Sequence, residues 1–421
     1  MKKVTFLLTI FISSAFSPIY GQLSIDDCYK KAQANYPLVK QYGLIEQSKE
    51  YNLSNANKGY LPQVSLSAKA SYQSEVTKLP ITLPNVVIKG VNKDQYQSVV
   101  EVNQTIWDGG VIHNQKKITE ASSTVDKQKL DVDMYAINER INQLFFGILL
   151  LDEQIKQNIL LQDELKRNYS QITSYMTNGI ANQADLDAVK VNQLNTAQRK
   201  VELEATRKAY REMLIAMIGE SIKEDTYLTK PSAAESVSLS EIINRPELQL
   251  FDAQSNLFET QKSIINSKNM PKLGLFIQGG YSNPALNMLK SEFTPYYIAG
   301  ARLSWNFGGL YTKKNEKKLL ETSKQNIAVQ KETFLFNTNL KMTQQNNEID
   351  KMKQLMQDDN EIIRLRASIK KAAEMKVENG TLSVTELLRE INSEDQAMQN
   401  KVLHEIQLLM SIYNYKNTTN N

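Results

Sequence analysis

Cysteine and histidine are almost absent from this sequence. Its 421 residues contain one cysteine, Cys28, and two histidines, His113 and His404. A single thiol excludes an intramolecular disulfide, a cysteine zinc site and a thiol redox pair. The two histidines lie far apart in the sequence, and neither a phosphate-binding glycine loop nor a histidine-supported nucleophile is recognisable. We therefore expect no enzymatic activity, no cofactor and no bound metal.

The sequence also lacks a strong excess of one charge and, after its first residues, a long apolar run. Lysine and arginine number 50 against 46 acidic residues, and this net charge of +4 gives no reason to expect nucleic acid as a partner. The run Leu144–Leu151 is far shorter than the roughly 18 residues of a membrane helix. Residues 1–21 join a basic start to an apolar stretch and Gly21, which favours a secretory signal peptide over a buried helix. We expect an exported protein without a helical anchor.

The sequence does contain an internal duplication. Four short motifs recur in the same order, at offsets of 209, 209, 198 and 201 residues. An ordered set at nearly constant spacing indicates two structural repeats. We expect the repeats at 22–219 and 239–416, with a linker at 220–238 and a polar tail at 417–421. The four pairs are Asn35-Tyr36-Pro37 with Asn244-Arg245-Pro246, Leu61-Pro62 with Met270-Pro271, Trp107-Asp108-Gly109-Gly110 with Trp305-Asn306-Phe307-Gly308-Gly309, and Asn178-Gly179 with Asn379-Gly380.

Each repeat carries the same succession of patterns. A helical segment ends at a proline, which cannot continue a helix. Two runs in which apolar and polar residues alternate then predict strands. Apolar residues at steps of three and four follow, and they predict a long coiled-coil hairpin. The expected segments are helices at about 24–60 and 239–269, strands at about 62–74, 95–107, 271–283 and 295–307, and hairpins at about 111–217 and 310–415.

These patterns predict a mainly α-helical protein with a membrane β-barrel portion. The strands are long enough to cross a bilayer when tilted, and lipid tolerates no open sheet edge. Four strands cannot close alone, since the smallest single-chain barrels use about eight. Several copies must therefore pool their strands, and helices this long also need neighbours for their apolar faces. The residues alone thus indicate a homo-oligomeric conduit with a water-filled bore.

The combination of these features resembles the TolC family of outer-membrane efflux proteins. It comprises the signal peptide, the two repeats, the Trp-Asp-Gly-Gly motif at 107–110, and turns in which Asn-Gly precedes Asp-Leu or Glu-Leu-Leu. The resemblance covers residues 22–416. It implies a homotrimer whose strand pairs form a shared twelve-stranded barrel in the outer membrane. The barrel would continue into a twelve-helix tunnel in the periplasm.

The resemblance also implies a function and partners. The protein would be a passive conduit of a tripartite efflux or type I secretion system, carrying small molecules or proteins to the exterior. A periplasmic adaptor (membrane fusion) protein and an inner-membrane pump of the RND, ABC or MFS type would dock on it, and outer-membrane lipid would surround it. A structural or adhesive coiled-coil surface protein is the alternative, but it does not account for the duplicated strand pairs. A periplasmic enzyme is disfavoured because no catalytic constellation is present.

Two groups of candidate site residues follow from this resemblance. The family closes its tunnel with acidic residues after the second hairpin turn, and matching Gly380 places Glu386 at that position. The next family acid falls on Arg389, a departure that suggests ion pairing between copies, with Asp185 as a further candidate partner. The alternative is that Glu386 and Arg389 form an ordinary solvated pair on one helix.

The hairpin turns themselves are the second group. In the family, adaptor tips dock at this place, which corresponds here to Gly179 and Ile180 in one turn and Gly380 and Leu382 in the other. The glycines are needed in any case to end a helix. We expect Ile180 and Leu382 to be exposed contact residues. A cluster of lysines at 313–318 is expected to form a solvated or headgroup-facing rim rather than a nucleic-acid site.

Overall fold

The structure of the protein is a computed structural model that describes residues 22–77, 91–220, 226–232 and 240–420. The expected signal peptide and most of the expected linker lie outside the described residues.

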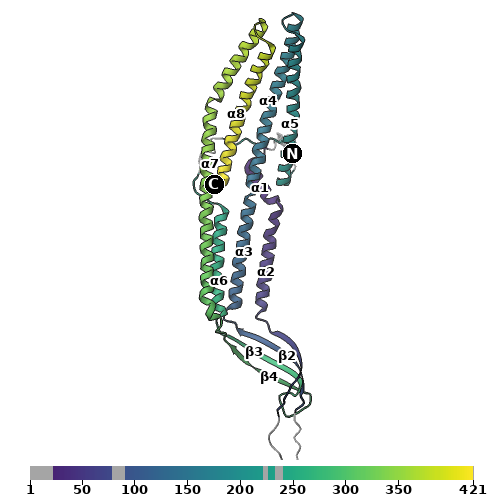
Figure 1. Ribbon diagram of the computed structural model, residues 1–421, viewed down its shortest axis with the longest axis vertical. Helices are drawn as coiled ribbons and strands as arrows, with labels where there is room; N and C mark the ends of the chain where they lie inside the picture. The colour runs from purple at the N-terminus through teal and green to yellow at the C-terminus, as the bar shows by residue number, and fades with distance from the viewer. Residues whose placement is uncertain (1–21, 78–90, 221–225, 233–239, 421) are drawn as a thin grey trace, which may run out of the picture. The chain divides into compact units, whose positions relative to one another are not determined.

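The chain divides into two compact units (Figure 1). The sheet unit comprises Lys40–Val132 and Pro246–Leu335. The hairpin unit comprises Met1–Val39, Asp133–Arg245 and Phe336–Asn421. Each unit therefore combines segments from both expected repeats.

The sheet unit contains one antiparallel sheet with the strand order β1-β2-β3-β4. The strands are β1 (Gln63–Tyr72), β2 (Asp94–Trp107), β3 (Lys272–Asn283) and β4 (Thr294–Ser304). Pairing of β2 with β3 joins the two repeats, with Val102 opposite Ile277. Within the described residues, β1 and β4 each have a strand neighbour on one side alone. The sheet thus has two open edges.

The two faces of this sheet differ in polarity because the side chains alternate along every strand. Residues opposite one another share a face, so the pairing Val64–Val102–Ile277–Ala299 gives one apolar row across all four strands. Large side chains on this face are exposed: Val64 by 70% and Tyr297 by 79%. The opposite face is rich in polar groups, among them Lys69, Gln97, Glu101, Gln278 and Arg302.

An ion pair and a close ring contact organise the polar face. Arg302 of β4 lies 3.7 Å from Glu101 of β2. The amide of Gln97 donates to the hydroxyl of Tyr296 at 2.8 Å. The ring of Tyr296 also lies across Gly280 of the neighbouring strand, where a Cβ atom would come within 2.4 Å of it. Glycine at 280 therefore lets the ring lie close against the sheet.

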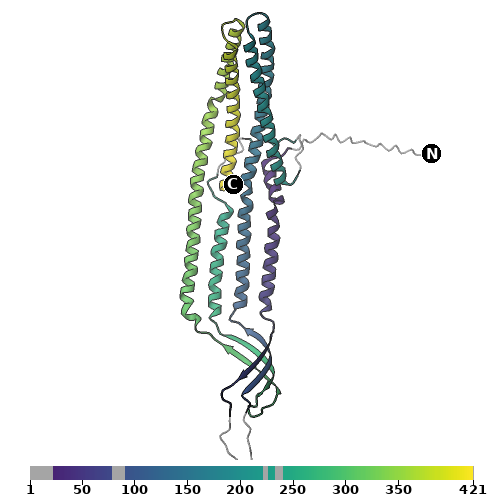
Figure 2. The same cartoon turned by 45° about the vertical axis from the view of Figure 1, so that its right-hand side comes forward.

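Four helices belong wholly or partly to the sheet unit: α2 (Gln41–Lys58), α3 (Val111–Tyr135), α6 (Pro246–Lys268) and α7 (Gly309–Glu378) (Figure 2). The leading helix of the first repeat was expected to be continuous, but it is broken. Helix α1 (Ile25–Asn35) is followed by the 3₁₀ turn Pro37–Lys40 before α2 begins. Pro37 lacks the N–H that a continuous helix requires. In the second repeat, residues 240–245 are not helical, and α6 begins at Pro246, a favoured residue for a first helical position.

The hairpin unit contains α1, α4 (Ile137–Thr177), α5 (Gln183–Ile218), α8 (Val384–Thr419) and the later part of α7. Phe145, Phe146 and Ile148 of α4 are completely buried. The first helix of the hairpin expected at about 111–217 is interrupted at Ala136, which separates α3 from α4. Ala136 keeps helical angles, with φ −60° and ψ −20°, so the interruption is slight.

Helix α8 runs into the segment expected as a polar tail, 417–421. Helix α8 continues to Thr419, and Thr418 and Thr419 are buried. The N–H of Asn244 donates to the carbonyl of Thr419 at 2.8 Å, and Arg245 donates to the carbonyl of Asn417 at 3.1 Å. These contacts hold the end of α8 against the segment that precedes α6.

Among the residues that the structure describes, none of the helices has the length and apolar character needed to cross a membrane.

Candidate functional site at the hairpin turns

The two hairpin turns of the hairpin unit have the same backbone geometry. Gly179 has φ +74° and Gly380 has φ +67°, a left-handed conformation that glycine adopts without strain. After each glycine, a backbone N–H reaches back five residues: Ile180 donates to Tyr175 and Thr381 to Lys376, both at 2.9 Å. This pattern is the Schellman motif that ends many helices. The duplication noticed in the sequence therefore extends to the hydrogen bonds of the turns.

The apolar residues of the two turns differ in exposure. Ile180 is 47% exposed, as expected. Leu382 is partly buried, because it packs against a core cluster that includes Val384 and Leu387. Leu382 is therefore less exposed than expected. Apart from the adjoining residues, no atom lies within 4 Å of a Cβ built at Gly179 or at Gly380, so the space beside both glycines is open.

Both candidate acids cap the helix that follows their turn. Asp185 accepts from the N–H of Asn182 at 3.0 Å, while its own N–H donates to the Asn182 side chain at 3.2 Å. Glu386 forms the same reciprocal arrangement with Ser383, at 3.3 and 3.2 Å. Each arrangement is a capping box, and a negative charge there also suits the positive end of the helix dipole. These carboxylates thus have a structural role within one copy.

Arg389 is not paired with either of these acids in the described part of the chain. Its guanidinium lies 3.5 Å from Glu390, and a second arginine, Arg366, approaches the other oxygen of the same carboxylate at 3.5 Å. Arg389 and Arg366 also line a groove of about 760 Å³ between α5, α7 and α8. The expected solvated pair of Glu386 with Arg389 is therefore not formed within one copy.

A buried cluster of charges further along the same helices was missed by sequence reasoning. Lys370 of α7 contacts Glu164 of α4 at 2.7 Å and also pairs with Glu394 of α8. Burial works against the charge of Lys370, but hydrogen bonds to the two glutamates outweigh it and raise its pKa. Glu394 is 6% exposed on its side chain. A signal was present, because Glu394 lies three residues after Ile391 and three before Ala397, within an apolar stripe.

Asp395 lies beside this cluster and is partly buried. Burial raises its pKa to about 6, and the charges of Glu164 and Glu394 act in the same direction. A hydrogen bond from Gln399 acts the other way. The region that joins α4, α7 and α8 thus contains a carboxyl group that titrates within two pH units of neutrality.

A comparison with protein families finds a match for the first repeat. A family model described as outer membrane efflux protein matches residues 28–220. No curated protein matches the sequence.

Solved structures resemble nearly the whole chain. CusC, a protein that forms a transmembrane channel, has a TM-score of 0.68 at 10% identity, over 94% of this chain and 91% of that chain. The outer-membrane channel OprN has a TM-score of 0.66 at 13% identity, over 94% and 89%. The CmeC outer membrane channel of Campylobacter jejuni has a TM-score of 0.63 at 12% identity, over 94% and 85%. At such identities the likeness establishes a shared fold.

Proposed function

Residues 28–220 belong to the outer membrane efflux protein family, and from this premise we propose that three copies of the chain form one passive efflux conduit. Nearly the whole chain has the fold of outer-membrane channels, which supports the proposal. The comparisons confirm the predicted resemblance to the TolC family and the mainly α-helical fold with strands. They also confirm the function as an outer-membrane channel of efflux systems and the location in the outer membrane with a periplasmic extension. The findings give no support to an adhesive protein. The family consists of transport channels; that this chain catalyses no reaction is part of the proposal.

The sheet carries the proposal of a trimer. One of its faces is apolar and exposed, and its edge strands β1 and β4 have open sides in the described chain. In lipid, unpaired backbone groups along an edge are too costly, so further strands must continue the sheet. Three copies with four strands each would close a barrel of twelve, with Lys69, Glu101 and Arg302 facing the water inside.

The partners follow from the same premise. We assign a periplasmic adaptor protein and an inner-membrane pump of the RND, ABC or MFS type to the periplasmic end, and outer-membrane lipid to the sheet. Efflux of small molecules is the first candidate function, because the matching family is described as outer membrane efflux protein. Type I secretion of proteins is the second candidate, because the same conduit could serve either pump.

The gate is proposed at Glu386 and Arg389, with Asp185 as a further participant. Within one copy only one oxygen of Glu386, Oε2, is used in the capping box. The second oxygen can accept from an arginine of a neighbouring copy, and Arg389 has an exposed side chain that can reach outward. A ring of such pairs would close the tunnel end by attraction between copies.

Single-channel conductance in planar bilayers tests the conduit and the gate together. We expect discrete channels from the wild type and a higher conductance from the variant Glu386→Gln with Arg389→Gln. Glutamine preserves the capping box and removes the charge, so the hairpin should remain folded. The control, Lys376→Gln with Glu378→Gln, neutralises two exposed charges beside the same turn and should leave conductance unchanged. Equal conductance in all three proteins would refute the gate, and absence of channels from the wild type would refute the conduit.

Docking of the adaptor is proposed at the two turns, through Gly179, Ile180, Gly380 and Leu382. The open space beside both glycines and the exposed side chain of Ile180 support this assignment. The variant Ile180→Ser should reduce the yield of adaptor that is crosslinked to the protein in native membranes. The matched control Ile159→Ser changes a residue of α4 that is 41% exposed but lies outside the turn. An equal yield from both variants would argue against docking at this turn.

A further inference from the structure

The first turns of α7 carry four lysines that have no acidic partner. Among the described residues, Lys313, Lys314, Lys317 and Lys318 form no ion pair. Lys314 and Lys318 are exposed, and the other two are half-buried. At 100° per residue, the four positions lie within about 140° of the helix circumference. The lysines therefore share one side of α7.

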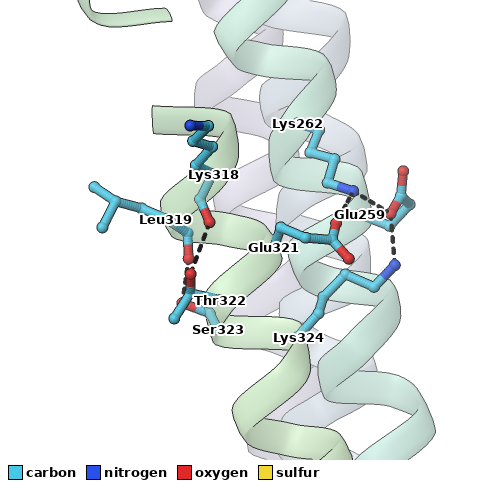
Figure 3. Close-up of polar contacts among 8 residues, drawn as sticks. All are labelled: Glu259, Lys262, Lys318, Leu319, Glu321, Thr322, Ser323 and Lys324. Atoms are coloured by element: carbon cyan, nitrogen blue, oxygen red, sulfur yellow. Dashed lines mark hydrogen bonds and ion pairs between the residues drawn. The ribbon is translucent and has the colours of Figure 1, made fainter. Parts of the chain in front are cut away.

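Lysines slightly further along the same unit behave differently. Lys262 of α6 contacts Glu259 at 3.0 Å and Glu321 of α7 at 2.8 Å, and Lys324 contacts Glu259 at 2.9 Å (Figure 3). In the same view, Lys318 reaches none of the carboxylates drawn. The unpaired state of the first four lysines is thus a local property, because partners are available within two turns of helix.

These lysines lie in the second and third turns of α7, just beyond a helix end that is itself positive. Helix α7 has no acidic residue in its first turn. The corresponding helix of the first repeat, α3, is capped by the carboxylate of Asp108, which accepts from Gly110 at 2.8 Å and from Ile112 at 2.6 Å. In the second repeat the capping residue is the neutral Asn306. An external anion would neutralise both the lysines and the helix end.

Aromatic side chains lie between this cluster and the sheet. Trp305 and Phe307 are 52% and 55% exposed, with ring centroids 4.7 Å apart, and Tyr311 is 86% exposed. The indole N–H of Trp305 donates to the carbonyl of Asn269, which fixes its orientation. Trp305 follows Leu303 of the apolar sheet face by two residues, so the apolar surface continues up to the lysines. Aromatic rings followed by cations match the order of a bilayer interface, where acyl chains give way to headgroups.

We propose that Lys313, Lys314, Lys317 and Lys318, together with Tyr311, bind the headgroups of anionic phospholipids in the membrane leaflet that faces the periplasm. The proposal rests on the assigned function, because it requires the sheet to lie in the outer membrane. The helices extend into the periplasm, so the start of α7 meets the inner of the two leaflets. Phosphate groups supply the negative charge that this helix end lacks. The cluster is therefore a selective contact for lipid.

Quenching of tryptophan fluorescence by brominated lipid tests this selectivity. The full-length variant Trp107→Phe leaves Trp305 as the single tryptophan, since the sequence contains two. It is reconstituted in phosphatidylethanolamine vesicles in which a minor share of brominated phosphatidylglycerol is present. We expect the fraction of phosphatidylglycerol among the lipids beside Trp305 to exceed its fraction in the whole vesicle by about fivefold. This ratio corresponds to the attraction of anionic lipid by one lysine near the membrane surface. The variant with all four lysines changed to glutamine should show the bulk share, and added sodium chloride should weaken the wild-type enrichment.

The control changes four exposed lysines far along the helices, Lys166, Lys341, Lys371 and Lys376, to glutamine. It alters net charge equally and should retain the enrichment. Enrichment that survives in the variant of 313–318, or disappears equally in the control, would overturn the proposal. Competition by inorganic phosphate beyond the effect of sodium chloride at equal ionic strength would show a site for free anions instead of a lipid surface. Channel conductance, measured on the same variant, separates failure of this inference from failure of the conduit.

Discussion

The two helical hairpins of the hairpin unit share the geometry of their turns but differ in what holds them. Between Ile141 and Leu151, α4 buries a nearly continuous apolar surface against its neighbours. The later part of α7 buries residues at wider intervals, and Thr338 and Asp359 are among them. Its contacts to α4 and α8 include the charged cluster around Lys370. The two repeats share the geometry of their helix ends, which the backbone dictates. In the interior of the second hairpin, ion pairs stand where the first hairpin has buried apolar side chains.

The largest effect should come from the apolar hairpin. Phe146→Ala removes a completely buried ring and should lower the free energy of unfolding by about 3–5 kcal/mol. Urea unfolding followed by circular dichroism in detergent measures this change. The matched variant Phe336→Ala, on α7, truncates a ring that is 63% exposed and should change the free energy by less than about 0.5 kcal/mol. Similar losses from both variants would abolish the distinction between the hairpins.

A smaller effect is expected from the charged cluster. Lys370→Ala leaves Glu164 and Glu394 facing each other without a cation, and we expect a loss of about 2 kcal/mol, since the site is partly hydrated. The neighbouring Lys371→Ala, at an exposed position, serves as the control. Adding Glu394→Gln to Lys370→Ala should restore part of the loss, because it removes one of the repelling charges. Equal urea midpoints for the two single variants would show that the cluster contributes nothing.

The smallest effect is a dependence on pH. Burial raises the pKa of Asp395 to about 6 from an ordinary value of 3.8, so between these values the folded protein binds a proton that the unfolded chain releases. This group therefore makes the protein more stable as the pH falls from 7 to 5. The gain in urea midpoint on acidification should be smaller in Asp395→Asn than in the wild type. The exposed Asp358→Asn should behave like the wild type. A larger gain in Asp395→Asn would contradict the sign of this argument.

The sequence sufficed for the regular elements and the turns. Alternation of polarity located four strands to within about three residues, and the Asn-Gly motifs located both Schellman turns, because these are local relations between neighbouring residues. The break between α3 and α4 at Ala136 was not predictable, since no proline or glycine marks it. The contacts of Lys370 with Glu164 and of Arg366 with Glu390 also escaped prediction. The first of these contacts joins helices that are distant in sequence, and the residues of both contacts meet only after the hairpins have packed.

The turns beside the candidate site were predicted, but the hydrogen bonds of the candidate acids were not. The match at Gly380 correctly located a turn, yet the sequence did not reveal that Asp185 and Glu386 each close a capping box. The residues of these boxes, Asn182 and Ser383, stand three positions earlier and were available as a signal. The partial burial of Leu382 depends on α7 and α8 lying around a common core, which a single stretch of sequence does not specify.

The contact of Tyr296 with Gly280 has a consequence for passage of cargo. A tyrosine side chain that pointed away from the polar face would narrow the interior of a closed barrel. Because residue 280 has no side chain, the ring of Tyr296 lies flat against the sheet instead. In the proposed barrel, the hydrogen atom at 280 would thus leave the lumen wider than a side chain at that position would allow.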